Sequence, residues 1–96
     1  MTDVTVVGAG PNGLAAAVTM ARAGLAVRVL EAAPTAGGGT RTSELIRPGH
    51  RHDVCSAVHP MALAAPFFRD FALSERIRLE VPEVSYAQPL DGGRAA

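Results

Sequence analysis

The sequence contains no Trp and no Lys, and it has a single Cys among 96 residues. One thiol cannot close an intramolecular disulfide, so a disulfide-stapled secreted module is excluded and a reducing, cytoplasmic location is expected. The nine basic residues are balanced by nine acidic ones, and a net charge of zero gives no basic surface for DNA or RNA. Nucleic acid is therefore not expected as a partner.

The chain also lacks a long uninterrupted apolar run. Its N-terminus has Asp3 and no basic residue before the first apolar stretch, so we expect no signal peptide. Residues 14–30 include Arg22 and Arg28 and fall short of the roughly 18 uncharged residues of a membrane span. No transmembrane segment is expected.

Hydrophobic residues make up 48% of the sequence, which excludes a disordered segment and indicates a globular domain or part of one. A chain this short buries only somewhat more than about 60% of its unfolded surface, so an enzyme with its own substrate pocket would be hard to accommodate. We therefore expect a fragment of a larger protein, with the substrate domain absent.

The first 31 residues predict a strand, a turn, a helix and a second strand. Residues 3–7 form a β-branched run typical of a strand buried on both faces in a parallel sheet. Residues 11–23 have apolar side chains at helical spacing, and Gly24 is expected to end that helix. Residues 26–31 return to a β-branched run. The predicted fold is α/β, a Rossmann-like βαβ dinucleotide-binding unit with a parallel sheet.

Short strands and helical pieces are expected after this unit, because turn-forming and helix-breaking residues divide the sequence at Pro48-Gly49 and at Pro66. The expected elements are strands over residues 42–47 and 51–54, two helical pieces over residues 60–73, a strand over residues 84–87, and a turn at residues 91–93 with no second strand after it.

A glycine motif lies between the first strand and the helix. Gly8, Gly10 and Gly13 have the spacing G-x-G-x-x-G. The first glycine allows a tight turn, the second lets a diphosphate approach the backbone, and the third lets the helix lie close to the sheet. Pro11 and Asn12 open the helix, whose N-terminus offers free backbone donors and a partial positive charge to the diphosphate. The motif predicts a dinucleotide site.

An acidic residue completes this pattern. Glu31 ends the second strand eighteen residues after Gly13, where its carboxylate can accept hydrogen bonds from the ribose hydroxyls of adenosine. The same carboxylate would repel the 2′-phosphate of NADP. NAD and FAD share the ADP half, so the motif leaves both cofactors open. The alternative interpretation is an ordinary glycine turn with Glu31 as a solvated strand end.

A second glycine cluster follows this acid in the stretch VLEAAPTAGGGTRTSEL, with Gly37-Gly38 six residues after Glu31. The spacing resembles FAD-dependent oxidoreductases of the amine oxidase and phytoene desaturase superfamily. Many amine oxidases have Arg directly after the glycine pair, whereas this chain has Gly39 there and Arg41 two positions later. Together with Thr42, Glu44, Pro48-Gly49 and Asp53, the pattern is most similar to the phytoene dehydrogenase-related branch.

The resemblance implies FAD as the cofactor and an unknown apolar or amine-like small molecule as the substrate. It adds Gly38, Gly39 and Arg41 to the cofactor-binding residues, with residues 1–45 as the nucleotide cradle and residues 46–96 as the start of the flavin-proximal region. The implied function is the FAD-binding part of a flavin-dependent oxidoreductase, with catalytic residues elsewhere and no activity in the 96 residues alone. An NAD(P)-binding module and a ligand-free fragment without activity remain alternatives.

The other candidate sites have weaker support. His50, His52 and His59 lack the Cys pair or carboxylates that would complete a metal site, so no metal is expected. Cys55 is interpreted as a small core residue, although the resemblance implies a place near the flavin ring. Apolar side chains that are expected to lack full packing partners, and so to promote self-association, are Met61, Leu63, Phe67, Phe68 and Phe71.

Overall fold

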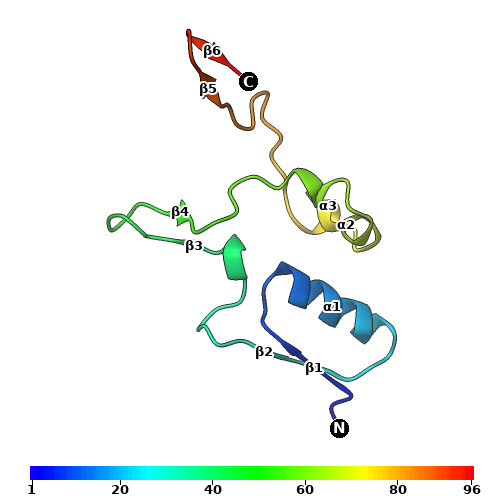
Figure 1. Ribbon diagram of the computed structural model, residues 1–96. Coiled ribbons are helices and arrows are strands. Elements are labelled where there is room, and N and C mark those ends of the chain that lie inside the picture. Colours follow the sequence, from blue (N-terminus) through cyan, green and yellow to red (C-terminus); the bar gives the residue numbers. More distant parts are fainter. The chain divides into compact units, whose positions relative to one another are not determined.

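The computed structural model describes residues 1–96, which divide into two compact units, Met1–Ala57 and Val58–Ala96 (Figure 1). The elements of the first unit are β1 (Val4–Val7), α1 (Pro11–Arg22), β2 (Val27–Leu30), η1 (Gly38–Thr40), β3 (Thr42–Ser43) and β4 (His52–Asp53). The elements of the second unit are η2 (Pro60–Ala62), α2 (Pro66–Asp70), α3 (Leu73–Arg76), β5 (Pro89–Leu90) and β6 (Arg94–Ala95). None of the helices has the length and apolar character that a membrane span needs.

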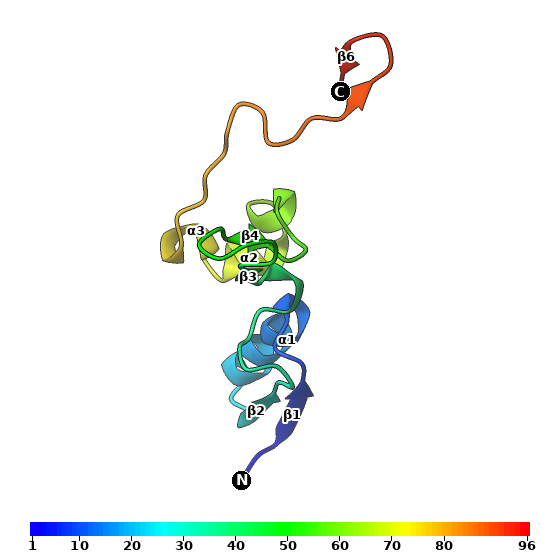
Figure 2. The same ribbon diagram turned by 90° about the vertical axis from the view of Figure 1, so that its left-hand side faces the viewer.

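The first unit begins with the predicted strand, helix and strand. β1 and β2 are parallel neighbours, as Figure 2 shows, and Val4 pairs with Val27 while Val7 pairs with Leu30. α1 connects them, as a parallel pair requires. The α/β fold with a Rossmann-like βαβ unit is therefore confirmed.

Only one face of this sheet is covered. Val4 and Val6 alternate with more exposed neighbours along β1, and the helix lies on their side, where Ala17 of α1 is buried. Val7 points the other way and is 82% exposed. The prediction that this strand is buried on both faces is wrong for this structure, because α1 covers one face and no element of the unit lies on the other.

α1 begins and ends at the residues that the sequence indicates. Pro11 occupies its first position, where the missing N–H is not needed. At the other end Gly24 adopts a φ of +88° and donates its N–H to the Ala21 carbonyl, while the Leu25 N–H bonds Met20. These two bonds form the reversal that ends many helices at glycine. They turn the chain back toward β2.

The remaining elements of the first unit are a short antiparallel pair. Thr42 pairs with Asp53 and Ser43 with His52, so β3 and β4 lie within the two predicted strands but are shorter than expected. Gly49 has a φ of +79° in the connecting turn, which confirms the turn at Pro48-Gly49. This pair follows η1 directly, and the N–H groups of Val54 and Ser56 just after β4 bond the carbonyls of Arg41 and Gly39, which ties the pair to the second glycine cluster.

The second unit contains the predicted helical pieces. Pro66 starts α2 and so separates it from η2, which confirms the predicted division. Three aromatic side chains are half-buried among themselves: the Phe67 ring lies 5.5 Å from Phe68 and 5.7 Å from Phe71, measured between centroids. The Arg76 guanidinium lies 4.4 Å from the Phe71 centroid. Met61 and Leu63 stay exposed, and self-association through this region stays a prediction.

The end of the chain differs from the expectation. Residues 84–87 are not a strand, and the turn at 91–93 is followed by one, because β5 and β6 pair across it. Gly92 and Gly93 have φ values of +76° and +73°, conformations that favour glycine and close a tight turn. A tight turn pairs the residues directly before and after it, here β5 and β6. Residues 84–87 lie farther from the turn and so are not part of the hairpin.

The close approach of α1 to β1 yields a test at Gly13. A methyl group at this position would lie deep inside van der Waals contact with the carbonyl oxygen of Gly8 and 3.2 Å from its carbon. Gly13→Ala gains about 1 kcal/mol of helix propensity, but backbone overpacking costs about 1–3 kcal/mol, so we expect a net loss. The measurement is thermal unfolding followed by circular dichroism.

Gly10→Ala is the matched control for this substitution. Its added methyl would meet nothing nearer than the Gly38 Cα at 3.8 Å, so the unfolding temperature should stay close to that of the unmodified chain. An unchanged or raised unfolding temperature in Gly13→Ala would contradict the role assigned to this close approach.

Candidate functional site

The three motif glycines play three different structural roles. Gly8 has a φ of +99° with open space around its missing side chain, so its backbone conformation is what favours glycine. Gly13 provides the close approach of helix and strand described above. Gly10 has an ordinary φ of −77°, and a methyl group there would only touch Gly38 at van der Waals distance. Neither strain nor crowding within the chain accounts for glycine at this middle position.

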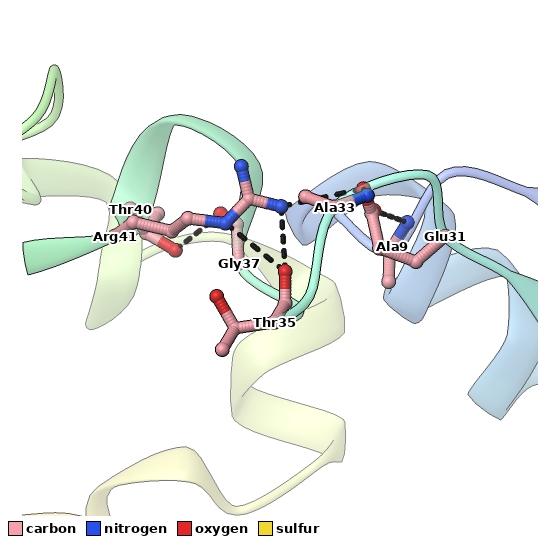
Figure 3. Close-up of polar contacts among 7 residues, drawn as sticks. All are labelled: Ala9, Glu31, Ala33, Thr35, Gly37, Thr40 and Arg41. Atoms are coloured by element: carbon pink, nitrogen blue, oxygen red, sulfur yellow. Dashed lines mark hydrogen bonds and ion pairs between the residues drawn. The ribbon is translucent and has the colours of Figure 1, made fainter.

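Glu31 lies directly beyond β2 and reaches back to the first glycine loop. Its Oε2 accepts the Ala9 N–H at 2.7 Å, and its Oε1 accepts the Ala33 N–H at 2.9 Å (Figure 3). Its side chain is 23% exposed. The carboxylate thus fixes the first loop from one side while part of it stays accessible.

The second glycine cluster lies against the first loop. Gly37 donates its N–H to the Ala9 carbonyl at 2.8 Å, and the Gly38 backbone approaches so closely that a methyl group there would be 3.1 Å from the Gly10 Cα. Gly38 has a φ of +54°, and Gly39 accepts the Ser56 N–H. The two glycine loops therefore form one backbone surface.

Several backbone N–H groups on these two loops donate to no acceptor of the chain. They belong to Gly10, Asn12, Gly13, Gly38 and Gly39. Two of them are in the first turn of α1, where the helix dipole adds a partial positive charge. Unpartnered donors of this kind bind phosphate oxygens, so this surface fits the diphosphate of a dinucleotide.

Arg41 joins the second loop to the acid. Its Nη2 lies 3.3 Å from Glu31 Oε1 and donates to the Thr35 carbonyl at 2.6 Å, while its Nε donates to the same carbonyl at 3.1 Å. Figure 3 shows the guanidinium between Thr35 and the end of the Glu31 side chain. The ion pair thus joins two predicted site residues, the acid Glu31 and the arginine Arg41 that follows the second glycine cluster.

These partners keep the Glu31 carboxylate charged. The N–H groups of Ala33 and Ala9 lower the pKa of Glu31 below its ordinary value of 4.5 and outweigh the desolvation that raises it, and the Arg41 charge lowers it further. A carboxylate has about four acceptor positions, and three are used here. The remaining one belongs to Oε2, which accepts only the Ala9 N–H.

The structure brings the candidate residues into one region of the first unit. Those drawn together are Gly8, Gly10, Pro11, Asn12, Gly13, Glu31, Gly38, Gly39 and Arg41. Sequence reasoning missed Ala9 and the Thr35 carbonyl, and it used Gly37 as part of the glycine pattern without a bonding role, yet these three hold this region together. The sequence does carry a signal for Ala9, because it is a small residue between two glycines. Small side chains there leave room for other groups to hydrogen-bond both its N–H and its carbonyl.

Cys55 has a different environment from the one expected. It is exposed, so the prediction of a small core residue is wrong. Its Cβ lies beside the second loop, where a methyl group added at Gly39 would be 3.3 Å away from it. The structure has no group of three or more His, Cys, Asp or Glu side chains that could hold a metal ion.

The sequence matches a known protein family. The family described as NAD(P)-binding Rossmann-like domain matches residues 6–71, which is more than half of the chain and includes the whole site. No curated protein matches the sequence.

The charged state of Glu31 yields a prediction for acid stability. A carboxyl whose pKa is lowered by folding stabilises the fold above its unfolded pKa, and this contribution is lost as pH falls through the lower, folded pKa. We therefore expect the unfolding free energy of the chain to fall as pH decreases from 4.5, and to fall less steeply in Glu31→Gln. Denaturant unfolding at stepped pH measures both.

Glu44→Gln is the control, because Glu44 is an exposed carboxylate of the same unit without these partners. It should retain the acid sensitivity of the unmodified chain. Identical pH profiles for all three proteins would show that the hydrogen bonds to Glu31 contribute nothing to the fold.

Proposed function

Because the chain belongs to the NAD(P)-binding Rossmann-like domain family, of the kind found in flavin oxidoreductases, we propose that it binds the ADP half of FAD. In this proposal it serves a flavin-dependent oxidoreductase of the phytoene dehydrogenase-related branch. The nucleotide cradle covers residues 1–45, residues 46–96 begin the flavin-proximal region, and the substrate domain lies outside the 96 residues. The substrate is a small apolar or amine-like molecule.

One observation carries this proposal: two glycine loops meet in a single backbone surface with unpartnered N–H donors. A methyl group at Gly10 or Gly38 would project where these loops approach each other. Neutral backbone donors suit a diphosphate because they bind it without a side chain whose conformational freedom must be lost. Glu31 lies at the edge of the same surface with one acceptor position left for a ribose hydroxyl.

Support for FAD over NAD comes from the second loop. A dinucleotide cradle needs only the first glycine loop and the acid, whereas the flavoprotein pattern adds the glycines after the acid, and here Gly37 and Gly38 lie directly on the first loop. NAD is the alternative ligand, favoured by the description of the matched family.

The residues of this chain have binding roles in this proposal. The N–H groups of Gly10, Asn12 and Gly13 hold the diphosphate from the helix side, and those of Gly38 and Gly39 hold it from the second loop. Glu31 binds the ribose. A bound flavin supplies hydride and electron transfer.

Glu31→Ala tests the ribose contact. It removes a charge-assisted hydrogen bond to the ligand, so ADP and FAD should dissociate about ten-fold or more easily. Isothermal titration of the purified chain with ADP measures the change, and Glu44→Ala should leave the affinity as it was. An unchanged affinity in Glu31→Ala would show that the acid makes no contact with the ribose and would contradict the role proposed for it.

The purified 96-residue chain provides the second test. Because it contacts only the ADP half, we expect it to bind ADP, FAD and NAD with affinities within about three-fold of one another, all weakly, and to show no turnover. FAD binding is followed by flavin fluorescence. A stoichiometric, sub-micromolar complex with FAD, or substrate-dependent bleaching of bound flavin, would show that these residues form a self-sufficient flavoprotein and contradict the proposed division of labour.

A further inference from the structure

Arg41 is held in place before any ligand is considered. Two of its nitrogens converge on the Thr35 carbonyl, at 2.6 and 3.1 Å. Its own carbonyl accepts the Val54 N–H at 2.9 Å, and this ties its backbone to the antiparallel pair. The fork of the guanidinium is thereby fixed in direction, since a planar group with two bonds to one acceptor cannot rotate freely.

The space for this arginine depends on a glycine. Gly37 has a φ of +127°, and a methyl group there would lie 3.1 Å from the Arg41 Cγ. The same glycine bonds the Ala9 carbonyl. The second loop therefore sets the position of Arg41 and the position of the first loop together.

The pinned arginine determines how the two oxygens of Glu31 are used. Oε1 receives the Arg41 guanidinium and the Ala33 N–H, while Oε2 receives only the Ala9 N–H. Rotation of the carboxylate would exchange these environments, and the ion pair opposes that rotation. The oxygen with a remaining acceptor position is therefore kept on the side of the first glycine loop.

From this arrangement we propose that Arg41 is a positioning residue that sets the ribose selectivity of the site by fixing the Glu31 carboxylate, and that it does so without contacting the nucleotide. The proposal rests on the proposed function, because it concerns the same nucleotide site. It differs from the expectation of Arg41 as a direct cofactor ligand. The ion pair also neutralises the acid, so the carboxylate meets the ribose without adding a net negative charge near the diphosphate.

The two roles of Arg41 predict different ligand dependence. An arginine that acts through Glu31 influences only the ribose hydroxyls, whereas an arginine on the diphosphate influences every ligand that carries one. Its Nη1 makes none of the contacts described, so direct contact is a real competing outcome. Adenosine, ADP and 2′-deoxy-ADP separate the two roles, because they differ in one group at a time.

The experiment titrates the full 96-residue chain and its Arg41→Gln variant with these three probes by calorimetry. In the unmodified chain we expect ADP to bind about ten-fold more tightly than 2′-deoxy-ADP. In Arg41→Gln this ratio should fall below about three-fold, while the ratio between ADP and adenosine stays unchanged. Arg28→Gln, which removes a positive charge from β2, should alter neither ratio.

A conservative variant allows the test to be made even if Arg41→Gln does not fold. Arg41→Lys retains the charge but lacks the fork that grips the Thr35 carbonyl, so its ratio of ADP to 2′-deoxy-ADP should lie between those of the unmodified chain and Arg41→Gln. Circular dichroism checks that each variant is folded. If Arg41→Gln does not fold, the intermediate ratio in Arg41→Lys supports the proposal and an unchanged ratio overturns it.

A pH series adds a readout that a merely structural residue would not move. Arg41 is the charged side chain that faces Glu31, and the other partners are the N–H groups of Ala9 and Ala33. Selectivity for ADP over 2′-deoxy-ADP should vanish as Glu31 protonates, and at a higher pH in Arg41→Gln. Phosphate ionisation affects both probes alike and cancels in the ratio. An unchanged midpoint overturns the proposal.

The remaining outcomes are also decisive. If Arg41→Gln weakens ADP and 2′-deoxy-ADP equally, Arg41 contacts the diphosphate or merely supports the fold, and the positioning role is wrong. If the folded, unmodified chain binds none of the three probes, the proposed nucleotide function itself fails and the inference fails with it. Binding of ADP with loss of ribose selectivity in the variant supports both.

Discussion

The structure of the first unit depends on two hydrogen bonds made by the backbone of one residue, Ala9. Its N–H bonds the Glu31 carboxylate and its carbonyl accepts the Gly37 N–H, so one peptide segment joins the end of β2 to the second glycine cluster. Ala9 is 4% exposed, and a buried backbone group without a partner would cost free energy. Breaking either bond would therefore leave an unpaired group in a place that water reaches poorly.

This dependence on backbone bonds follows from how little side-chain core the unit has. Ala9 and Ala17 are the buried hydrophobic residues, and both are small. Burial of two alanines contributes far less than burial of leucine or phenylalanine, so hydrogen bonds and glycine contacts have a larger share in the geometry. Close contacts between backbone segments take the place of large buried side chains. α1 lies against β1 at Gly13, and the two glycine loops meet at Gly10 and Gly38.

The sequence was sufficient for the elements with strong local signals and insufficient for those set by contacts between loops. The parallel strands, the helix from Pro11 and the stop at Gly24 follow from periodicity and backbone conformation, which are local properties. The ion pair between Glu31 and Arg41 has no such signal, because the nine residues between them, irregular up to η1, fix no direction between the two side chains. The strand expected over residues 84–87 and the missing second strand after the turn were wrong for a related reason: Gly92 and Gly93 decide which residues pair, and apolar character does not.

In the proposed site, backbone groups bind the diphosphate and side chains bind the ribose. This difference determines which substitutions should affect binding. The proposed diphosphate binding through N–H groups would depend on backbone conformation, so we expect it to tolerate many side chains but few replacements of glycine. In the proposed site, selectivity for the ribose would by contrast depend on one carboxylate, Glu31, which is paired with one arginine, Arg41. FAD and NAD present the same ADP half to these groups. In the proposed site, the N–H donors and the carboxylate would therefore bind both dinucleotides alike. In the proposed function, a choice between FAD and NAD therefore requires contacts beyond the groups that bind the shared ADP half.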